Sequence, residues 1–144
     1  MMQPDDEKLD ILESLSDEDR EDLTKCSQTI RFVPGDVLVN VGEKDEGVFI
    51  VMVGAVEVTT KGSFGRDKVI AEIHQGSIFG ELSFFDHQPR IAAVTAISNG
   101  FALHLTPNGL NRLASHNPEL ALQLLLGLGK VLSTRFRKTA EGAI

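Results

Sequence analysis

The chain contains one cysteine, no tryptophan and no tyrosine among its 144 residues. Because Cys26 has no second cysteine to pair with, the sequence excludes an internal disulfide. It also excludes an iron–sulfur centre of the kind found in oxygen sensors, since such a centre needs a set of cysteine ligands. There is neither a charged-then-apolar leader nor an apolar run long enough to cross a bilayer. We therefore expect a soluble, cytoplasmic protein.

Positive charge is also scarce, and the formal net charge is −7. Much of the negative charge falls in residues 17–22, where a solvated helix face is the simplest interpretation. Such an acidic chain is not expected to bind nucleic acid by itself. An anionic ligand would need a local positive site.

What the sequence does contain is apolar residues, 42% of the total, enough for the core of one domain. The middle of the chain reads as short segments rich in Val, Ile and Phe, separated by glycines. Many short strands at close spacing predict an antiparallel β-roll or jelly-roll barrel. The predicted strands are residues 30–33, 37–41, 48–53, 55–60, 68–73, 92–96 and 101–105.

Helices are predicted on both sides of this β region, so the fold class is mainly β with flanking helices. Ser16, Thr106 and Asn117 are in position to cap helices, and a proline follows each of the last two. Gly127 and Gly129 indicate a bend or a close backbone contact in the last helix. We expect one domain over residues 9–138, with flexible ends at 1–8 and 139–144. The predicted helices are residues 9–15, 17–25, 107–115 and 119–138.

The segment from Gly76 to Ala96 carries the strongest chemical signal. Gly80 permits a sharp turn and close approach of a ligand. The residues after it are predicted to begin a short helix, which Phe84 and Phe85 anchor in the core. The first turn of a helix has free N–H groups that suit a phosphate. Arg90 offers a planar fork of donors for phosphate oxygens, and Glu81 can accept from a hydroxyl. This combination favours a ligand with both a phosphate and a sugar hydroxyl.

The motifs Phe79-Gly-Glu-Leu-Ser83 and Pro89-Arg-Ile-Ala-Ala-Val94 resemble the phosphate-binding cassette of cyclic nucleotide-binding domains. The upstream motif Val33-Pro-Gly-Asp-Val-Leu-Val39 resembles the early strands and turns of that family, which includes bacterial catabolite activator proteins and regulatory subunits of cyclic-AMP-dependent protein kinase. The resemblance covers roughly residues 9 to 137. It implies a regulatory module without catalysis, and ligand contacts from Phe79, Gly80, Glu81, Leu82, Ser83, Arg90, Ile91 and Ala92.

By this resemblance, Arg90 binds the cyclic phosphate and Glu81 accepts from the ribose 2′-hydroxyl. The chain departs from the family pattern at Ile91 and Ala93, where hydroxyl residues are common. The change loses a hydrogen bond of ~1 kcal/mol. Because a threonine after the arginine favours cyclic GMP in the family, Ile91 favours cyclic AMP over cyclic GMP. The resemblance also places the last helix over the base and allows a homodimer through it, with an unknown protein downstream.

Several alternatives stay open at this point. Arg90 and Glu81 could pair with each other and only brace the cassette. Ile91 could narrow the pocket, leaving a nucleotide-independent interaction or dimerisation module. The leucines of the last helix could pack on their own domain rather than on a second copy.

No catalytic or metal-binding pattern competes with this interpretation. The four histidines are scattered, with no pair at metal-ligand spacing, so no metal and no cofactor are expected. Ser83, Asp86 and His87 lie close in sequence, but no nucleophile-elbow pattern surrounds the serine. The glycines of 62–67 are followed by no helix and predict a mobile hairpin turn rather than a phosphate loop.

Overall fold

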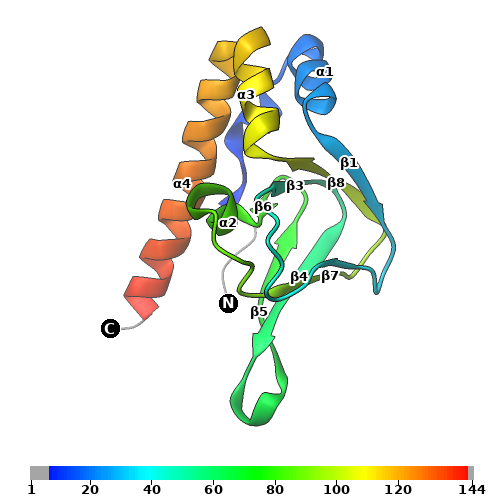
Figure 1. The fold of residues 1–144 in the computed structure, drawn as a ribbon, viewed down its shortest axis with the longest axis vertical. Helices are drawn as coiled ribbons and strands as arrows, with labels where there is room; N and C mark the ends of the chain where they lie inside the picture. The colour runs from blue at the N-terminus through cyan, green and yellow to red at the C-terminus, as the bar shows by residue number, and fades with distance from the viewer. Residues whose placement is uncertain (1–6, 143–144) are drawn as a thin grey trace.

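Two four-stranded antiparallel sheets form the middle of the molecule, and helices cover one side of it (Figure 1). The strand orders are β1-β8-β3-β6 and β2-β7-β4-β5. The structure is a computed structural model and describes residues 7–142. The helices and strands are η2 (Asp10–Glu13), α1 (Asp17–Lys25), β1 (Gln28–Phe32), β2 (Val37–Val39), β3 (Val48–Val53), β4 (Ala55–Lys61), η3 (Ser63–Gly65), β5 (Asp67–His74), β6 (Ile78–Phe79), α2 (Glu81–Asp86), β7 (Ala93–Ala96), β8 (Gly100–Leu105), α3 (Pro107–His116) and α4 (Pro118–Gly142).

The predicted fold class is confirmed, with three corrections of detail. The sheets share no strand pair among the residues described, so they form a roll and not a closed barrel. All seven predicted strands are present, but β6 was missed because it has only two residues and lies inside the cassette segment. The first predicted helix is only the short 3₁₀ helix η2.

Strand β3 separates two hydrophobic clusters. Successive side chains of a strand point to opposite faces, so Val48 and Ile50 join the cluster beneath the helices. Phe49 and Val51 join the cluster between the two sheets. A strand buried on both faces explains the unbroken apolar run of this segment.

The helices begin where the sequence predicts. Ser16 accepts a hydrogen bond from the Asp19 N–H in a capping box, and Thr106 accepts from the Gly109 N–H. Helix α4 runs without interruption and packs closely at Gly127, where a Cβ would lie 2.8 Å from Leu9 Cδ1. The predicted close contact is therefore present at Gly127.

The edges of the domain differ from the expected boundaries. Glu7, in the segment expected to be flexible, is only 4% exposed, and α4 continues to Gly142, past the expected end at residue 138. Buried ion pairs described below hold Glu7. Residues 1–6 and 143–144 of the predicted flexible ends lie outside the described residues.

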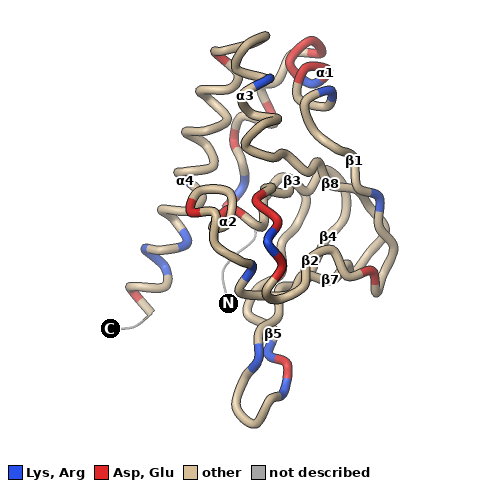
Figure 2. The backbone as a smooth tube through the Cα atoms, viewed as in Figure 1, with Lys and Arg blue, Asp and Glu red and all other residues tan. Residues whose placement is uncertain are grey.

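The charges are distributed unevenly over this fold (Figure 2). Acidic residues gather on α1 and on the segment between β2 and β3, and basic residues on the C-terminal half of α4. The hairpin of β4 and β5 projects from the body, as expected of a turn rather than a phosphate loop (Figure 1). None of the helices in residues 7–142 is both long and apolar enough to cross a membrane.

Candidate functional site

The cassette begins with a glycine in a left-handed conformation. Gly80 has φ +82°, and helix α2 starts at the next residue, as predicted. A Cβ at this position would lie 2.7 Å from the Arg90 Nη1 atom and 3.1 Å from the Gly47 carbonyl oxygen. The sequence argument assigned this glycine to the approach of a ligand. In the structure, the lack of a Cβ admits the guanidinium of Arg90.

Helix α2 is anchored by one phenylalanine and not by two. Phe84 is buried, whereas Phe85 is exposed, which corrects the expectation that both lie in the core. Their rings pack edge to face, with centroids 5.3 Å apart. No side chain caps the N-terminus of α2, so its first N–H groups have no side-chain acceptor among the residues described.

A cavity of about 350 Å³ opens beside this helix. All eight predicted ligand-contact residues line it: Phe79, Gly80, Glu81, Leu82, Ser83, Arg90, Ile91 and Ala92. The remaining lining residues, which sequence reasoning did not assign to the site, are mostly apolar and come from the β2-β7-β4-β5 sheet and from α4: Val39, Val58, Ile70, Ala71, Ile73, Val94, Leu132, Arg135, Phe136 and Thr139. A mostly apolar cavity with a few convergent polar groups is typical of a small-molecule site.

Arg90 lies in the wall of this cavity and is only 4% exposed. Its Nη1 donates to the Gly80 carbonyl at 2.9 Å, and its Nη2 donates to the Gly47 carbonyl at 2.5 Å. The Arg90 main chain is also fixed, because its N–H donates to Glu43 O at 2.8 Å and its carbonyl accepts from Gly42 N at 2.8 Å. The Nε atom is buried without a hydrogen-bond partner among residues 7–142. The guanidinium is therefore held in place with at least one donor unused.

Asp45 is the acidic partner of Arg90. Its Oδ2 lies 2.9 Å from Arg90 Nη2, and its Oδ1 accepts from the Gly47 N–H at 2.9 Å. His104 Nε2 lies 3.0 Å from both oxygens of Asp45. Burial by itself raises the pKa of Asp45, but the Gly47 N–H, the Arg90 guanidinium and His104 outweigh it and hold that pKa below its ordinary value.

Sequence reasoning missed Asp45 and His104. Asp45 is 45 positions before Arg90 (90 − 45), in a loop with no recognisable motif, and His104 lies on a strand among apolar residues. The only signal was for His104, as a polar residue inside an apolar strand, and such residues occur in many proteins without a functional site. We call Arg90, Asp45 and His104, with the carbonyls of Gly47 and Gly80, the Arg90 network.

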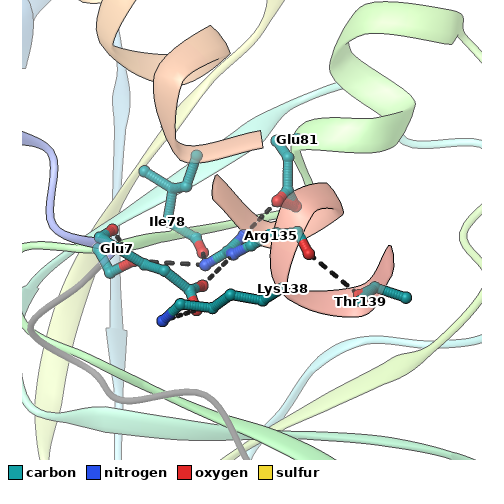
Figure 3. Close-up of polar contacts among 7 residues, drawn as sticks. Glu7, Ile78, Glu81, Arg135, Lys138 and Thr139 are labelled. Carbon is teal, nitrogen blue, oxygen red and sulfur yellow. Dashed lines mark hydrogen bonds and ion pairs between the residues drawn. The ribbon is translucent and has the colours of Figure 1, made fainter. Parts of the chain in front are cut away.

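Glu81 does not pair with Arg90. It lies at the start of α2 and pairs through Oε2 with Nη1 of Arg135, which reaches across from α4 (Figure 3). Arg135 Nε pairs with Glu7, and Arg135 Nη2 donates to the Ile78 carbonyl at 2.7 Å and contacts Ser77 Oγ at 3.3 Å. We call these five residues the Arg135 network. The alternative of a bracing pair between Arg90 and Glu81 is therefore wrong.

The Arg135 network joins three segments that are far apart in sequence (Figure 3). Glu7 comes from the N-terminal segment, Glu81 from the cassette and Arg135 from α4. Lys138 adds a second cation from α4, with Nζ 3.8 Å from Glu7 Oε2. Helix α4 is therefore tied to the carboxylate that the resemblance assigns to the ribose.

Ile91 lines the cavity without filling it. The side chain is 69% exposed, and Ala92 beside it is half-buried. The prediction of a pocket narrowed by Ile91 therefore finds no support in the position of this side chain.

A hydrolase triad is not assembled here. His87 Nδ1 lies 3.1 Å from Glu46 Oε2, and Asp86 Oδ1 accepts from the Gln88 N–H. Ser83 is thus not held next to a base that a third group orients. Across residues 7–142, no three or more His, Cys, Asp or Glu side chains are grouped so that they could hold a metal ion.

The sequence was also compared with known families. The model of the family described as "Cyclic nucleotide-binding domain" matches residues 29–117 of this chain. The chain belongs to the cyclic nucleotide-binding domain family. The matched residues include the whole cassette and both members of the Asp45–His104 contact.

Individual relatives are regulators by name. The chain is 31% identical over 117 residues to the "CRP-like cAMP-activated global transcriptional regulator" of Mycobacterium tuberculosis, covering 81% of this chain and 50% of that protein. It is 30% identical over 110 residues to the "cAMP-dependent protein kinase regulatory subunit" of Dictyostelium discoideum, covering 74% and 34%. This domain thus spans at most about half the length of these two relatives. Both are regulatory proteins rather than enzymes, in agreement with the prediction of a non-catalytic module.

A solved structure shows the same architecture. A cyclic nucleotide-binding domain from Methylobacillus flagellatus superposes with a TM-score of 0.79 at 25% identity, covering 94% of this chain and 79% of that chain. The agreement extends over nearly the whole β-roll and the helices around it.

Proposed function

We propose that this domain reversibly binds a cyclic mononucleotide, with cyclic AMP favoured over cyclic GMP, and acts as a regulatory module. The observation that carries the proposal is the convergence of all eight cassette residues on one cavity, with a buried arginine in its wall. Arg90 binds the cyclic phosphate with its unused donors, assisted by the free N–H groups at the start of α2. Glu81 accepts from the ribose 2′-hydroxyl through Oε1, since Oε2 faces Arg135.

The proposed signal leaves through α4. A ligand hydroxyl and Arg135 share the Glu81 carboxylate, so ligand binding changes the charge that holds α4 against the cassette. Leu132, Phe136 and Thr139 of the same helix line the cavity and cover the base. The ligand then shifts an equilibrium between positions of α4, and a partner protein reads that shift.

Thermal melting tests binding directly. A ligand at a hundred times its dissociation constant adds about 2.7 kcal/mol to the free energy of unfolding. We expect cyclic AMP at millimolar concentration to raise the melting temperature clearly, and AMP, which lacks the cyclic phosphodiester, to raise it less. No shift with cyclic AMP or cyclic GMP would contradict the proposal.

The preference for cyclic AMP rests on Ile91. Ile91→Thr adds a hydroxyl donor beside the phosphate, and we expect it to raise the affinity for cyclic GMP about fivefold, through one hydrogen bond of ~1 kcal/mol. The measurement is competition of both nucleotides against a fluorescent cyclic nucleotide. Ile91→Val, which adds no donor, is the matched control, and equal gains in the two variants would remove Ile91 as the cause.

A second candidate function is dimerisation through α4, which can accompany nucleotide binding or replace it. Leu122 and Leu126 lie one helical turn apart on α4 and are 58% and 66% exposed. Their spacing suits an antiparallel or parallel pair with a second copy of this chain. Leu126→Glu is expected to convert a dimer into a monomer in sedimentation equilibrium, and a wild-type monomer at high concentration would exclude this function.

Cytoplasmic localisation and the absence of a nucleic-acid partner stay predictions.

A further inference from the structure

His104, Asp45 and Arg90 form a line of three ionisable groups that ends at the cavity. His104 Nε2 lies 3.0 Å from the Asp45 carboxylate, and Asp45 Oδ2 lies 2.9 Å from Arg90 Nη2. The histidine side chain is mostly buried, and its ring lies against Phe49 with centroids 4.5 Å apart. Gly47 leaves room for it, because a Cβ there would collide with the imidazole.

Among residues 7–142, the charges of the Arg90 network, the Arg135 network and Lys138 cancel when His104 is neutral. Arg90 is balanced by the Asp45 carboxylate, whose lowered pKa keeps it ionised. Arg135 and Lys138 are two further cations, and the two carboxylates of the Arg135 network balance them. A phosphodiester carries one negative charge, so it would enter a site without excess positive charge.

We propose that a proton taken up by His104 supplies the net positive charge with which this cavity binds a cyclic phosphodiester; the inference rests on the function proposed above. A neutral His104 donates its Nε2–H to Asp45, and the second proton is added at Nδ1. Asp45 is then shared between two cations, and Arg90 is left with positive charge for the phosphate. His104 acts through Asp45 and is a positioning residue that does not contact the ligand.

The other neighbours of His104 leave Asp45 as its charged partner. Across the sheet, its register partners are Gln28 on β1 and Phe49 on β3, and neither titrates. Lys44 and Glu46 flank Asp45 in the loop and are exposed, and Glu46 pairs with His87. Arg90 is the cation that faces His104 through the carboxylate.

Linkage requires that ligand binding and proton uptake strengthen each other. Calorimetry with cyclic AMP at about pH 6 and about pH 8 is expected to show about fivefold tighter binding at the lower pH. Repeating each titration in buffers of different ionisation enthalpy is expected to show proton uptake by the wild-type protein. Equal affinities and no uptake would overturn the inference without any variant.

Two variants assign the proton to His104. His104→Gln keeps an N–H donor for Asp45 but cannot take up a proton, so it is expected to lower the affinity at pH 6 to the wild-type value at pH 8 and to abolish proton uptake. His116→Gln, an exposed histidine on α3, is the matched control and should keep the wild-type dependence. Loss of uptake in His87→Gln instead of His104→Gln would overturn the assignment.

The same titrations separate this inference from the proposed function. Binding with no dependence on pH overturns only the role of His104. The absence of binding of cyclic AMP and cyclic GMP at every pH overturns the proposed function, and the inference with it.

Discussion

The two arginines that line the cavity, Arg90 and Arg135, are held in different ways. Arg90 is fixed mainly by main-chain carbonyls and by one carboxylate from a neighbouring loop, and its Nε has no hydrogen-bond partner in the part of the chain that the structure describes. Arg135 is fixed by two carboxylates, a carbonyl and a hydroxyl, from segments up to 128 positions away. Both side chains are nearly buried.

This difference assigns them different tasks. An arginine has five N–H donors. The donors of Arg135 face protein acceptors on every side, so it stabilises the contact between α4, the cassette and the N-terminal segment. Arg90 keeps its Nε–H without an acceptor among residues 7–142, which supports the proposal that it binds a ligand oxygen. The predictions below test this division of roles.

The largest effect is expected at Arg135. Arg135→Ala leaves Glu7 and Glu81 buried without their main cation, which should lower the free energy of unfolding by ~3–5 kcal/mol. Urea denaturation measures the loss. Arg137→Ala, exposed on the same helix, is the matched control and should change stability by less than about 0.5 kcal/mol. Equal stabilities of the two variants would remove the structural role of Arg135.

Arg90 should act on the ligand rather than mainly on the fold. Arg90→Ala is expected to cost about 2–5 kcal/mol of cyclic AMP binding, because a buried phosphate loses its charged partner. Calorimetry measures the change, with Arg31→Ala, an exposed arginine on β1, as control. An affinity equal to the wild-type value would mean that Arg90 is a structural residue like Arg135.

A smaller loss of stability and of nucleotide binding is expected when Gly80, which leaves room for the Arg90 guanidinium, is replaced. Gly80→Ala forces a side chain into a left-handed conformation, at about 1–3 kcal/mol, and places Cβ against the guanidinium. We expect lower stability and weaker nucleotide binding together. Gly129→Ala is the control, because α4 offers open space there and alanine favours a helix by about 1 kcal/mol. A Gly80→Ala protein with unchanged affinity would show that ligand binding by Arg90 does not depend on its close contact with Gly80.

The smallest expected effect is that of Asp45→Asn on the stability of the protein at acid pH. Its pKa is lowered in the folded protein, so its contribution to stability is present above the ordinary value of 3.8 and is lost as the pH falls through the lowered value. Asp45→Asn should therefore show a shallower loss of stability below that ordinary pKa than the wild type. Melting temperatures across the acid range measure this, with Asp67→Asn, at an exposed ion pair, as control. Identical acid profiles of wild type and Asp45→Asn would contradict the role of this carboxylate.

The sequence by itself determined the β-roll and the position of the cassette. Strand and helix signals are local, and the Val and Ile runs, the caps at Ser16 and Thr106 and the motif around Gly80 are all read within a few residues. The resemblance of the cassette motifs to the family identified eight residues that line one cavity. The contact between Gly80 and Arg90 was not predicted, because the two residues meet only in the folded chain.

Only the tertiary structure decided which charges meet. Asp45, His104, Arg135 and Glu7 carry no motif, and periodicity reports the buried face of a segment but not the distant group that faces it. A buried charge must find a partner, because leaving it unpaired is costly. From the sequence alone, several acidic residues could have paired with Arg90, including Glu81. In the folded protein, α4 packs against the cassette and Glu81 pairs with Arg135. Arg90 pairs instead with Asp45, from the loop before β3.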